Sequence, residues 1–193
     1  MDLLIQNLPT IAALVTTGVF AGLLAGLLGV GGGIVIVPVL YFLFQAFGVS
    51  PESAMVVATA TSLATIVPTS ISSIRAHRSK GNVDFALLKA WGIFIFIGVL
   101  IGSWLVTRVN GQWLTVLFGV IATLSAFNMF LGGKKAVFDS LPGKAGQSAM
   151  GTSVGLFSSL VGIGGGTLTV PMLTFCNYPA HKAVGTAAAI GLI

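Results

Sequence analysis

Apolar residues run along this chain in long stretches that only short polar segments interrupt. No Asp, Glu, Lys or Arg occurs from Leu3 to Pro51, from Asn110 to Gly133, or from Ala145 to His181. Each of these runs exceeds the roughly 20 apolar residues that cross a bilayer as a helix. We therefore expect an all-α polytopic membrane protein. Its apolar segments are expected at about 10–28, 34–47, 54–74, 84–106, 112–131, 146–161, 167–176 and 183–193.

Composition supports the membrane class and excludes several others. Charged residues make up 7% of the chain and hydrophobic residues 55%, whereas a soluble domain carries about a quarter charged residues. The first apolar run lacks a basic start and is too long for a cleaved signal peptide. The net charge of +5 is spread over loops, so we expect no nucleic-acid partner. The single Cys176 excludes an intrachain disulfide and a Cys-based metal cluster, and we expect neither a metal nor a cofactor.

One glycine motif occurs twice and indicates two repeats. Gly29–Pro38 has the pattern Gly-x-Gly-Gly-Gly-x-x-x-x-Pro, and Gly162–Pro171 repeats it. Small residues upstream match as well and predict a face for close helix packing. They are Gly18, Gly22 and Gly26 in the first copy, and Gly151, Gly155 and Ser159 in the second. We expect a first repeat over 1–133, a linker over 134–145, and a second repeat over 146–193 that is incomplete, which suggests a truncated sequence.

Each motif is expected to interrupt a helix. Three successive glycines each destabilise a helix by roughly 1 kcal/mol relative to alanine, and the later proline removes a backbone donor. Backbone amides freed in this way must face protein, water or a ligand, and amides at a helix start favour anions. The alternative is a purely structural re-entrant break. No Gly-Lys-Ser/Thr follows either copy, which excludes a phosphate-binding P-loop. The predicted substrate-binding glycines are Gly31, Gly32, Gly33, Gly164, Gly165 and Gly166, and the predicted structural breaks are Gly29, Pro38, Gly162 and Pro171.

Uncharged hydroxyls and one cation complete the candidate site. Thr61 and Ser62 follow the first motif and Thr186 the second, although such hydroxyls often bond carbonyls of their own helix. Lys182 is the candidate cation at the mouth of an anion path, or else it extends to the lipid interface. Carboxylates occur only in or beside loops, which argues against a cation path. No nucleophile and base lie within helical reach, so we do not expect an enzyme.

Charge in the loops predicts orientation. The basic loops at 75–89 and 134–144 are expected on the cytoplasmic side. The loop after the first motif carries Glu52, and its counterpart carries His181 and Lys182. If each broken element returns to the side it came from, the two repeats are inverted, and if it crosses once they are parallel. Parallel repeats would move Lys182 to the outer side. The distribution of basic residues therefore favours inverted repeats, by this one residue.

The chain resembles the sulfite exporter TauE/SafE family of bacterial membrane permeases. The resemblance rests on the two glycine motifs, on Ala60-Thr61-Ser62-Leu63, and on Pro179–Thr186 after the second motif. It covers essentially the whole chain, although the family pattern often has Thr-Ser where this sequence has Thr186-Ala187. The resemblance implies a secondary transporter of sulfite, sulfonates or related organosulfur anions in the cytoplasmic membrane, often proposed to be proton-linked. A passive anion channel and a non-transporting membrane assembly component are the alternatives, and a homo-oligomer is compatible with each.

Overall fold

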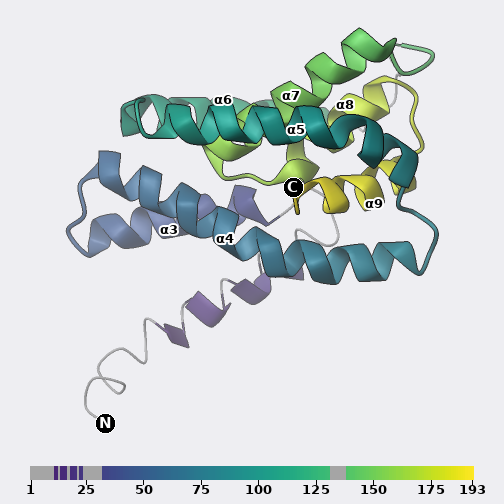
Figure 1. The fold of residues 1–193 in the computed structure, drawn as a ribbon. Helices are drawn as coiled ribbons and strands as arrows, with labels where there is room; N and C mark the ends of the chain where they lie inside the picture. Colours follow the sequence, from purple (N-terminus) through teal and green to yellow (C-terminus); the bar gives the residue numbers. More distant parts are fainter. Residues whose placement is uncertain (1–10, 13, 17, 21, 24–31, 131–137) are drawn as a thin grey trace.

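The computed structural model describes residues 11–12, 14–16, 18–20, 22–23, 32–130 and 138–193. Within these ranges every regular element is a helix, which confirms the expected all-α fold (Figure 1). The helices are α3 (Gly33–Ala46), α4 (Pro51–Arg78), α5 (Phe85–Val106), α6 (Gly111–Phe130), α7 (Lys144–Val161), α8 (Gly165–Phe175) and α9 (Ala180–Ile190).

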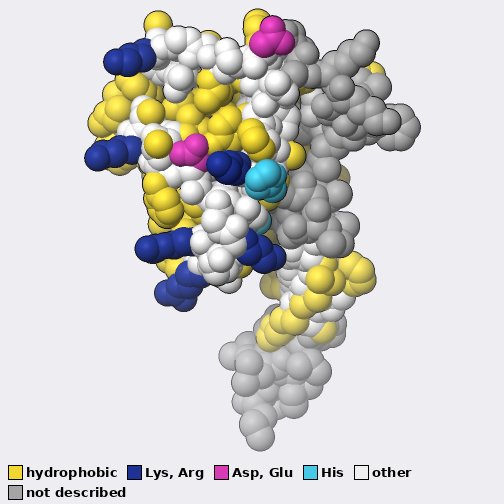
Figure 2. All heavy atoms as spheres, turned by 90° about the vertical axis from the view of Figure 1, so that its right-hand side faces the viewer, with side chains coloured by type: hydrophobic (Ala, Val, Ile, Leu, Met, Phe, Trp, Pro, Cys, Tyr) yellow, Lys and Arg dark blue, Asp and Glu magenta, His cyan; other side chains and the backbone are white. Residues whose placement is uncertain are grey.

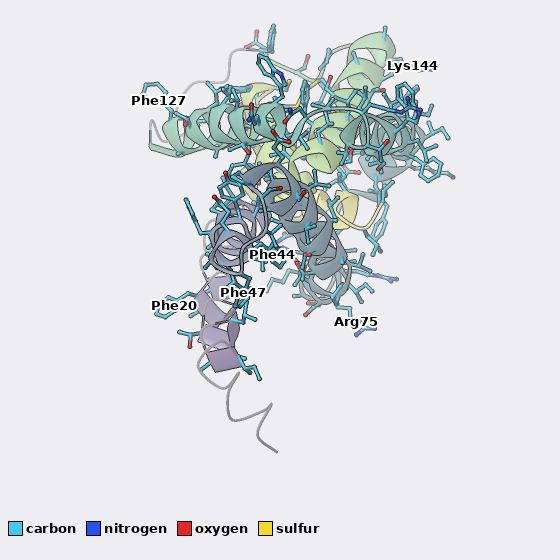
Figure 3. The ribbon with its side chains drawn as sticks, turned by 90° about the vertical axis from the view of Figure 1, so that its left-hand side faces the viewer. Phe20, Phe44, Phe47, Arg75, Phe127 and Lys144 are labelled. Carbon is cyan, nitrogen blue, oxygen red and sulfur yellow. The ribbon has the colours of Figure 1, made fainter. Side chains whose placement is uncertain are left out.

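Among the described residues, three helices are long and apolar enough to cross a membrane: Pro51–Arg78, Phe85–Val106 and Gly111–Asn128. Their outer faces carry large apolar side chains, among them Trp104 on α5 and Leu124 on α6, which are 59% and 64% exposed. Figure 3 shows Phe127 on the outside of the bundle. An apolar surface of this extent suits lipid and not water. The chain is an integral membrane protein.

The ends of the long helices follow local sequence signals. Helix α4 begins after Ser50, whose hydroxyl accepts a hydrogen bond from the Ser53 amide, and Pro51 occupies the first helical turn. Its last turn carries Arg75 and Arg78, whose positive charge complements the negative end of the helix dipole. Asp84 caps α5 by accepting hydrogen bonds from the Ala86 and Leu87 amides. Polar caps therefore mark where these apolar helices start and stop.

Glycines allow α5 and α7 to pack backbone against backbone. A Cβ atom placed on Gly98 of α5 would lie 2.2 Å from the Thr152 carbonyl oxygen, and one on Gly155 of α7 would lie 2.1 Å from the Ile95 carbonyl oxygen. The packing role expected for the second small-residue face is therefore confirmed. Added Cβ atoms at Gly18 and Gly22 would meet none of the described residues within 4 Å, and Gly26 itself lies outside the described residues.

The turns after α3, α4, α5 and α8 lie at two ends of the bundle (Figure 1). At one end, the Gln112 side-chain amide donates to the Glu52 carboxylate over 3.2 Å, so the turn after α3 lies beside the turn after α5. At the other end, Tyr178 donates to Asp84, so the turn after α8 lies beside the turn after α4. Helices α3 and α8 therefore finish at opposite ends.

The segment before α7 lies beside the end of α8. The Phe138 amide donates to the carbonyl of Phe175, the last residue of α8, over 3.0 Å. Helix α7 runs inward from this end and α8 runs back toward it (Figure 1). The chain reverses between them at Gly162–Gly164, in the middle of the bundle.

Candidate functional site

The second glycine motif forms a tight reversal between α7 and α8. Helix α7 ends at Val161 and α8 begins at Gly165. Gly162 and Gly164 have φ angles of 71° and 76°, a region that glycine adopts without the steric cost that a Cβ atom brings. Glycine at these two positions is therefore what lets two short connected helices turn back on each other.

The two glycine motifs touch at this reversal. A Cβ atom on Gly33, the first residue of α3, would lie 2.3 Å from the Gly162 carbonyl oxygen and 2.7 Å from the Ile163 Cα atom. The buried Ser62 hydroxyl of α4 donates to the same Gly162 carbonyl over 2.7 Å. The start of α3, the middle of α4 and the second interruption thus form one close-packed junction.

A cavity of about 190 Å³ lies on the other side of the second interruption, between α4, α5, α7 and the end of α9. Gly164 and Gly165 line it together with Ser158 of α7. Helix α8 starts at Gly165, so the amides of its first turn have no acceptor inside the helix. None of the described residues that line the cavity is charged.

Buried hydroxyls without partners surround the junction. Thr59, Ser158 and Thr169 each have a buried side-chain oxygen with no hydrogen-bond partner in the part of the chain that the structure describes. Leaving a buried hydroxyl unpaired costs about 1–3 kcal/mol. Thr59 lies against Gly162 and Ser158 lines the cavity, so two of these hydroxyls flank the second interruption. Sequence reasoning singled out neither Ser158 nor Thr169, since a serine or threonine inside an apolar helix carries no local signal of its pairing.

The predicted site residues divide into two groups. The junction and the cavity contain Gly33, Ser62, Gly162, Gly164 and Gly165. Thr61 is engaged elsewhere, because its hydroxyl donates to the Val57 carbonyl of its own helix over 2.8 Å. Gly32 and Gly166 are half-buried beside the motif contacts. Gly29 and Gly31 lie outside the described residues.

Both motif prolines lie inside helices and not in the interruption. Pro38 is within α3 and Pro171 within α8. Proline has no backbone N–H to bond the carbonyl four residues earlier. Helices α3 and α8 therefore each lack one backbone hydrogen bond. Glycine near a helix start costs less than glycine in its interior, which is why α3 and α8 begin within the glycine triplets.

Thr186 belongs to a cluster at the end of the bundle and not to the cavity. Its buried hydroxyl accepts from the Asp84 amide over 3.0 Å, and a Cβ atom on the neighbouring Gly185 would lie 2.3 Å from the Asn82 carbonyl oxygen. The Asp84 carboxylate also accepts from the Tyr178 hydroxyl. The turn after α4 and the start of α9 are thereby fastened together.

Hydrogen bonding sets the acidity of this cluster. The bond from Tyr178, followed by the bond from the Leu87 amide, lowers the pKa of Asp84 below its ordinary 3.8. Burial, and then the bond to Asp84, raises the pKa of Tyr178. Sequence analysis missed both residues, although an Asp directly before an apolar run is a helix-start signal.

The lowered pKa predicts a pH-dependent stability. Because the folded-state pKa of Asp84 lies below 3.8, its contribution is complete above that value and is lost as the pH falls through the folded pKa. We expect the melting temperature of the detergent-solubilised protein to drop as the pH falls below 3.8 and through the folded-state pKa of Asp84. Asp84→Asn should flatten that drop, whereas Asp139→Asn, at an exposed turn, should keep it. Equal drops in the wild type and in Asp84→Asn would contradict the assignment.

Basic side chains collect at the same end. Figure 2 looks onto this end and shows several Lys and Arg side chains around one Asp or Glu. Arg75, Arg78, Lys80 and Lys89, at the end of α4 and the start of α5, are exposed. Lys182 is exposed as well, and its charge helps to lower the pKa of Asp84. Lys182 therefore lies at the surface of this end and not in the cavity.

Comparison with known proteins identifies the family. A family model described as sulfite exporter TauE/SafE matches residues 14–193. A probable membrane transporter protein of Haemophilus influenzae is 34% identical over 91% of this chain and 67% of its own length. Similar proteins of the same description occur in Methanocaldococcus jannaschii (30% identical, 93% of this chain, 67% of the relative) and Bacillus subtilis (32%, 90% and 71%). No solved structure matches the chain. Because the family model covers nearly the whole chain, this protein belongs to the sulfite exporter TauE/SafE family of membrane transporters.

Proposed function

We propose that this protein is a secondary transporter that moves small sulfur-containing oxyanions, such as sulfite or a sulfonate, across the cytoplasmic membrane. The observation that carries the proposal is the junction itself: the start of α3 at the first motif meets the interruption between α7 and α8 in the middle of the bundle, beside a cavity with a hydroxyl that has no partner among the described residues. A glycine break in matching places of two halves is typical of a transporter binding site. Coupling to protons is part of the proposal.

An uncharged site of this kind suits an anion. The amides at the start of α8 carry partial positive charge and can bind oxygen atoms without a fixed cation. In this proposal Gly164–Gly166 supply those amides, while Ser62 positions the interruption by bonding the Gly162 carbonyl. Gly31–Gly33 take the corresponding place in the first motif. In this conformation Thr61 donates to a carbonyl of its own helix, and Thr186 lies beside Asp84 at the end of the bundle. Both would donate to substrate only in another conformation.

We propose further that 1–133 and 146–193 are inverted repeats joined by the linker at 134–145. Helices α3 and α8 leave the junction toward opposite ends of the bundle, and α7 and α8 enter and return at one end. Both observations suit inversion with a re-entrant second element better than parallel repeats. The basic end, with loop 75–89 and the described part of loop 134–144, would face the cytoplasm, where Lys182 would raise the local anion concentration.

Alternating access would then rock one repeat against the other around the junction. The contacts of Asp84 with Tyr178 and Thr186 join the two proposed repeats at the basic end. They would close the path on that side in the conformation described here. Opening toward the cytoplasm would require these bonds to break.

Flux measurements with glycine variants test the proposal. We expect proteoliposomes containing the full chain to take up sulfite or a sulfonate, and Gly165→Leu and Gly32→Leu to reduce the rate at least tenfold. A Cβ atom at Gly165 would already lie 2.7 Å from the Ile190 side chain at the cavity. Gly119→Leu on α6, where an added Cβ atom meets nothing within 4 Å, is the matched control.

The same liposomes separate a carrier from its alternatives. A carrier shows faster uptake when substrate is loaded on the opposite side, whereas a passive channel shows unitary currents and no such exchange. Unchanged flux in both Gly32→Leu and Gly165→Leu, in protein that still folds, would rule out the proposed site. Absence of any flux by the wild type would favour a non-transporting assembly component.

A further inference from the structure

The cavity beside the second interruption contains a hydroxyl donor that the protein leaves free. Ser158 is 7% exposed, lines the cavity, and its side-chain oxygen has no partner among the described residues. The neighbouring Ser159 differs, because its hydroxyl donates to the Leu156 carbonyl over 3.0 Å. A bound group that accepts a hydrogen bond would remove the cost of the unpaired Ser158 hydroxyl.

The cavity lining combines a few polar groups with many apolar side chains. Ser158 lines it together with Gly164 and Gly165 at the start of α8. Most of the α4 and α5 lining is aliphatic, including Leu63 and Val99, with Ser103 as a further hydroxyl. Purely inorganic anions would leave the aliphatic side chains without a partner. A ligand with an anionic head and a short hydrocarbon body would contact both kinds of group.

The volume of the cavity suits a short hydrocarbon body. The cavity measures about 190 Å³, which corresponds to roughly six water molecules at about 30 Å³ each. An oxyanion head and a chain of two or three carbon atoms fit such a volume. Because the cavity is partly open, a longer chain would extend beyond the aliphatic lining.

We propose that Ser158 is a substrate-binding residue whose hydroxyl donates to an oxygen of a small alkanesulfonate. The amides at the start of α8 bind the other head-group oxygens, and the aliphatic walls of α4 and α5 hold the carbon chain. This inference rests on the proposed function and deepens it, because it places the substrate at Ser158 and selects an organic oxyanion over an inorganic one. It also gives the second motif a hydroxyl donor in place of Thr186, which is bonded to Asp84.

Calorimetric titration of the purified full chain in detergent tests this inference directly. We expect ethanesulfonate and propanesulfonate to bind more tightly than sulfate or sulfite. Ser158→Ala should weaken sulfonate binding at least tenfold, since hydrogen bonds to charged groups contribute that much or more. Its melting temperature without ligand should not fall, because the lost hydroxyl has no partner among the residues that the structure describes. Ser153→Ala is the matched control on the same helix, since Ser153 bonds the Ala149 carbonyl and lies outside the cavity lining.

The possible outcomes test the Ser158 inference separately from the proposed transport function on which it rests. Equal affinity in the wild type and Ser158→Ala, no sulfonate binding by the wild type, or sulfate binding as tight as ethanesulfonate would each overturn the inference. Sulfonate binding that Ser158→Ala weakens, without flux in proteoliposomes, would support the inference and remove the transport function. If Ser158→Ala does not fold, Ser158→Cys keeps the shape with a weaker donor and should show the same loss of affinity.

Discussion

Alanine at Gly33 should severely destabilise the protein, whereas alanine at Gly32 should be tolerated. A Cβ atom on Gly33 would lie 2.3 Å from the Gly162 carbonyl oxygen and 2.8 Å from the Ile163 carbonyl carbon. Both obstacles are backbone atoms that cannot rotate away, so the two motifs must move apart. Among the described residues, a Cβ atom on Gly32 would meet only the end of the Ile36 side chain, at 3.2 Å. Overpacking of this kind typically costs about 1–3 kcal/mol, and we expect Gly33→Ala at the upper end of that range.

Unfolding by SDS in mixed micelles measures this difference. Gly32→Ala should unfold close to the wild-type midpoint and Gly33→Ala at a clearly lower SDS fraction. Gly162→Ala should resemble Gly33→Ala, because Gly162 has a φ of 71° and an added Cβ atom would lie 2.9 Å from the Thr59 Cα atom. Equal midpoints for Gly32→Ala and Gly33→Ala would mean that the two motifs do not touch as described.

This contact marks the limit of what the sequence can predict about the site. Two glycine motifs in matching places indicate two interruptions, and the hydroxyl of Ser62 is visible as a polar group inside an apolar run. That Ser62 bonds the Gly162 carbonyl is not predictable, because the pair is 100 residues apart and depends on how α4 packs across the second motif. The residue types were therefore foreseeable and their partners were not.

Helix positions were easier to predict than contacts between helices, because the bounds of a helix depend on residues near in sequence. The segment expected at 84–106 is found at Phe85–Val106, since Asp84 caps its start and the apolar run fixes its length. Helix α8 begins at Gly165, two residues before the expected 167. Helix propensity penalises interior glycine, but the first residues of a helix escape most of that cost. Propensity alone therefore places this helix start too late.

Similar small-residue faces can also have different surroundings. Gly18 and Gly22 match Gly151 and Gly155 in sequence, yet added Cβ atoms would meet nothing within 4 Å at the first pair and backbone atoms of α5 at Gly155. Spacing identifies a face that permits close approach, but it does not say which helix approaches. The partner of the second face, Gly98 and Gly102 on α5, follows from tertiary packing alone.

Alanine at Gly98 or Gly155 should separate α5 from α7. Added Cβ atoms would lie 2.2 Å from the Thr152 carbonyl oxygen and 2.1 Å from the Ile95 carbonyl oxygen, respectively. Between helices in a membrane, close packing takes the place of the hydrophobic effect, so losing this fit removes much of what holds the pair together. We expect each variant to lose about 1–3 kcal/mol of unfolding free energy. Gly92→Ala on the same helix is the matched control, since its nearest contact would be an ordinary 3.7 Å.

A double-mutant cycle shows whether the two glycines support one interface. Once Gly98→Ala has moved α7 away from α5, the added methyl of Gly155→Ala should meet less resistance. The double variant should therefore lose less stability than the two single losses together, as expected for residues in one contact. Gly92→Ala should keep its wild-type stability or gain up to about 1 kcal/mol from better helix propensity. Additive losses, or a Gly92→Ala variant as unstable as Gly98→Ala, would show that the variants do not act through close packing of α5 on α7.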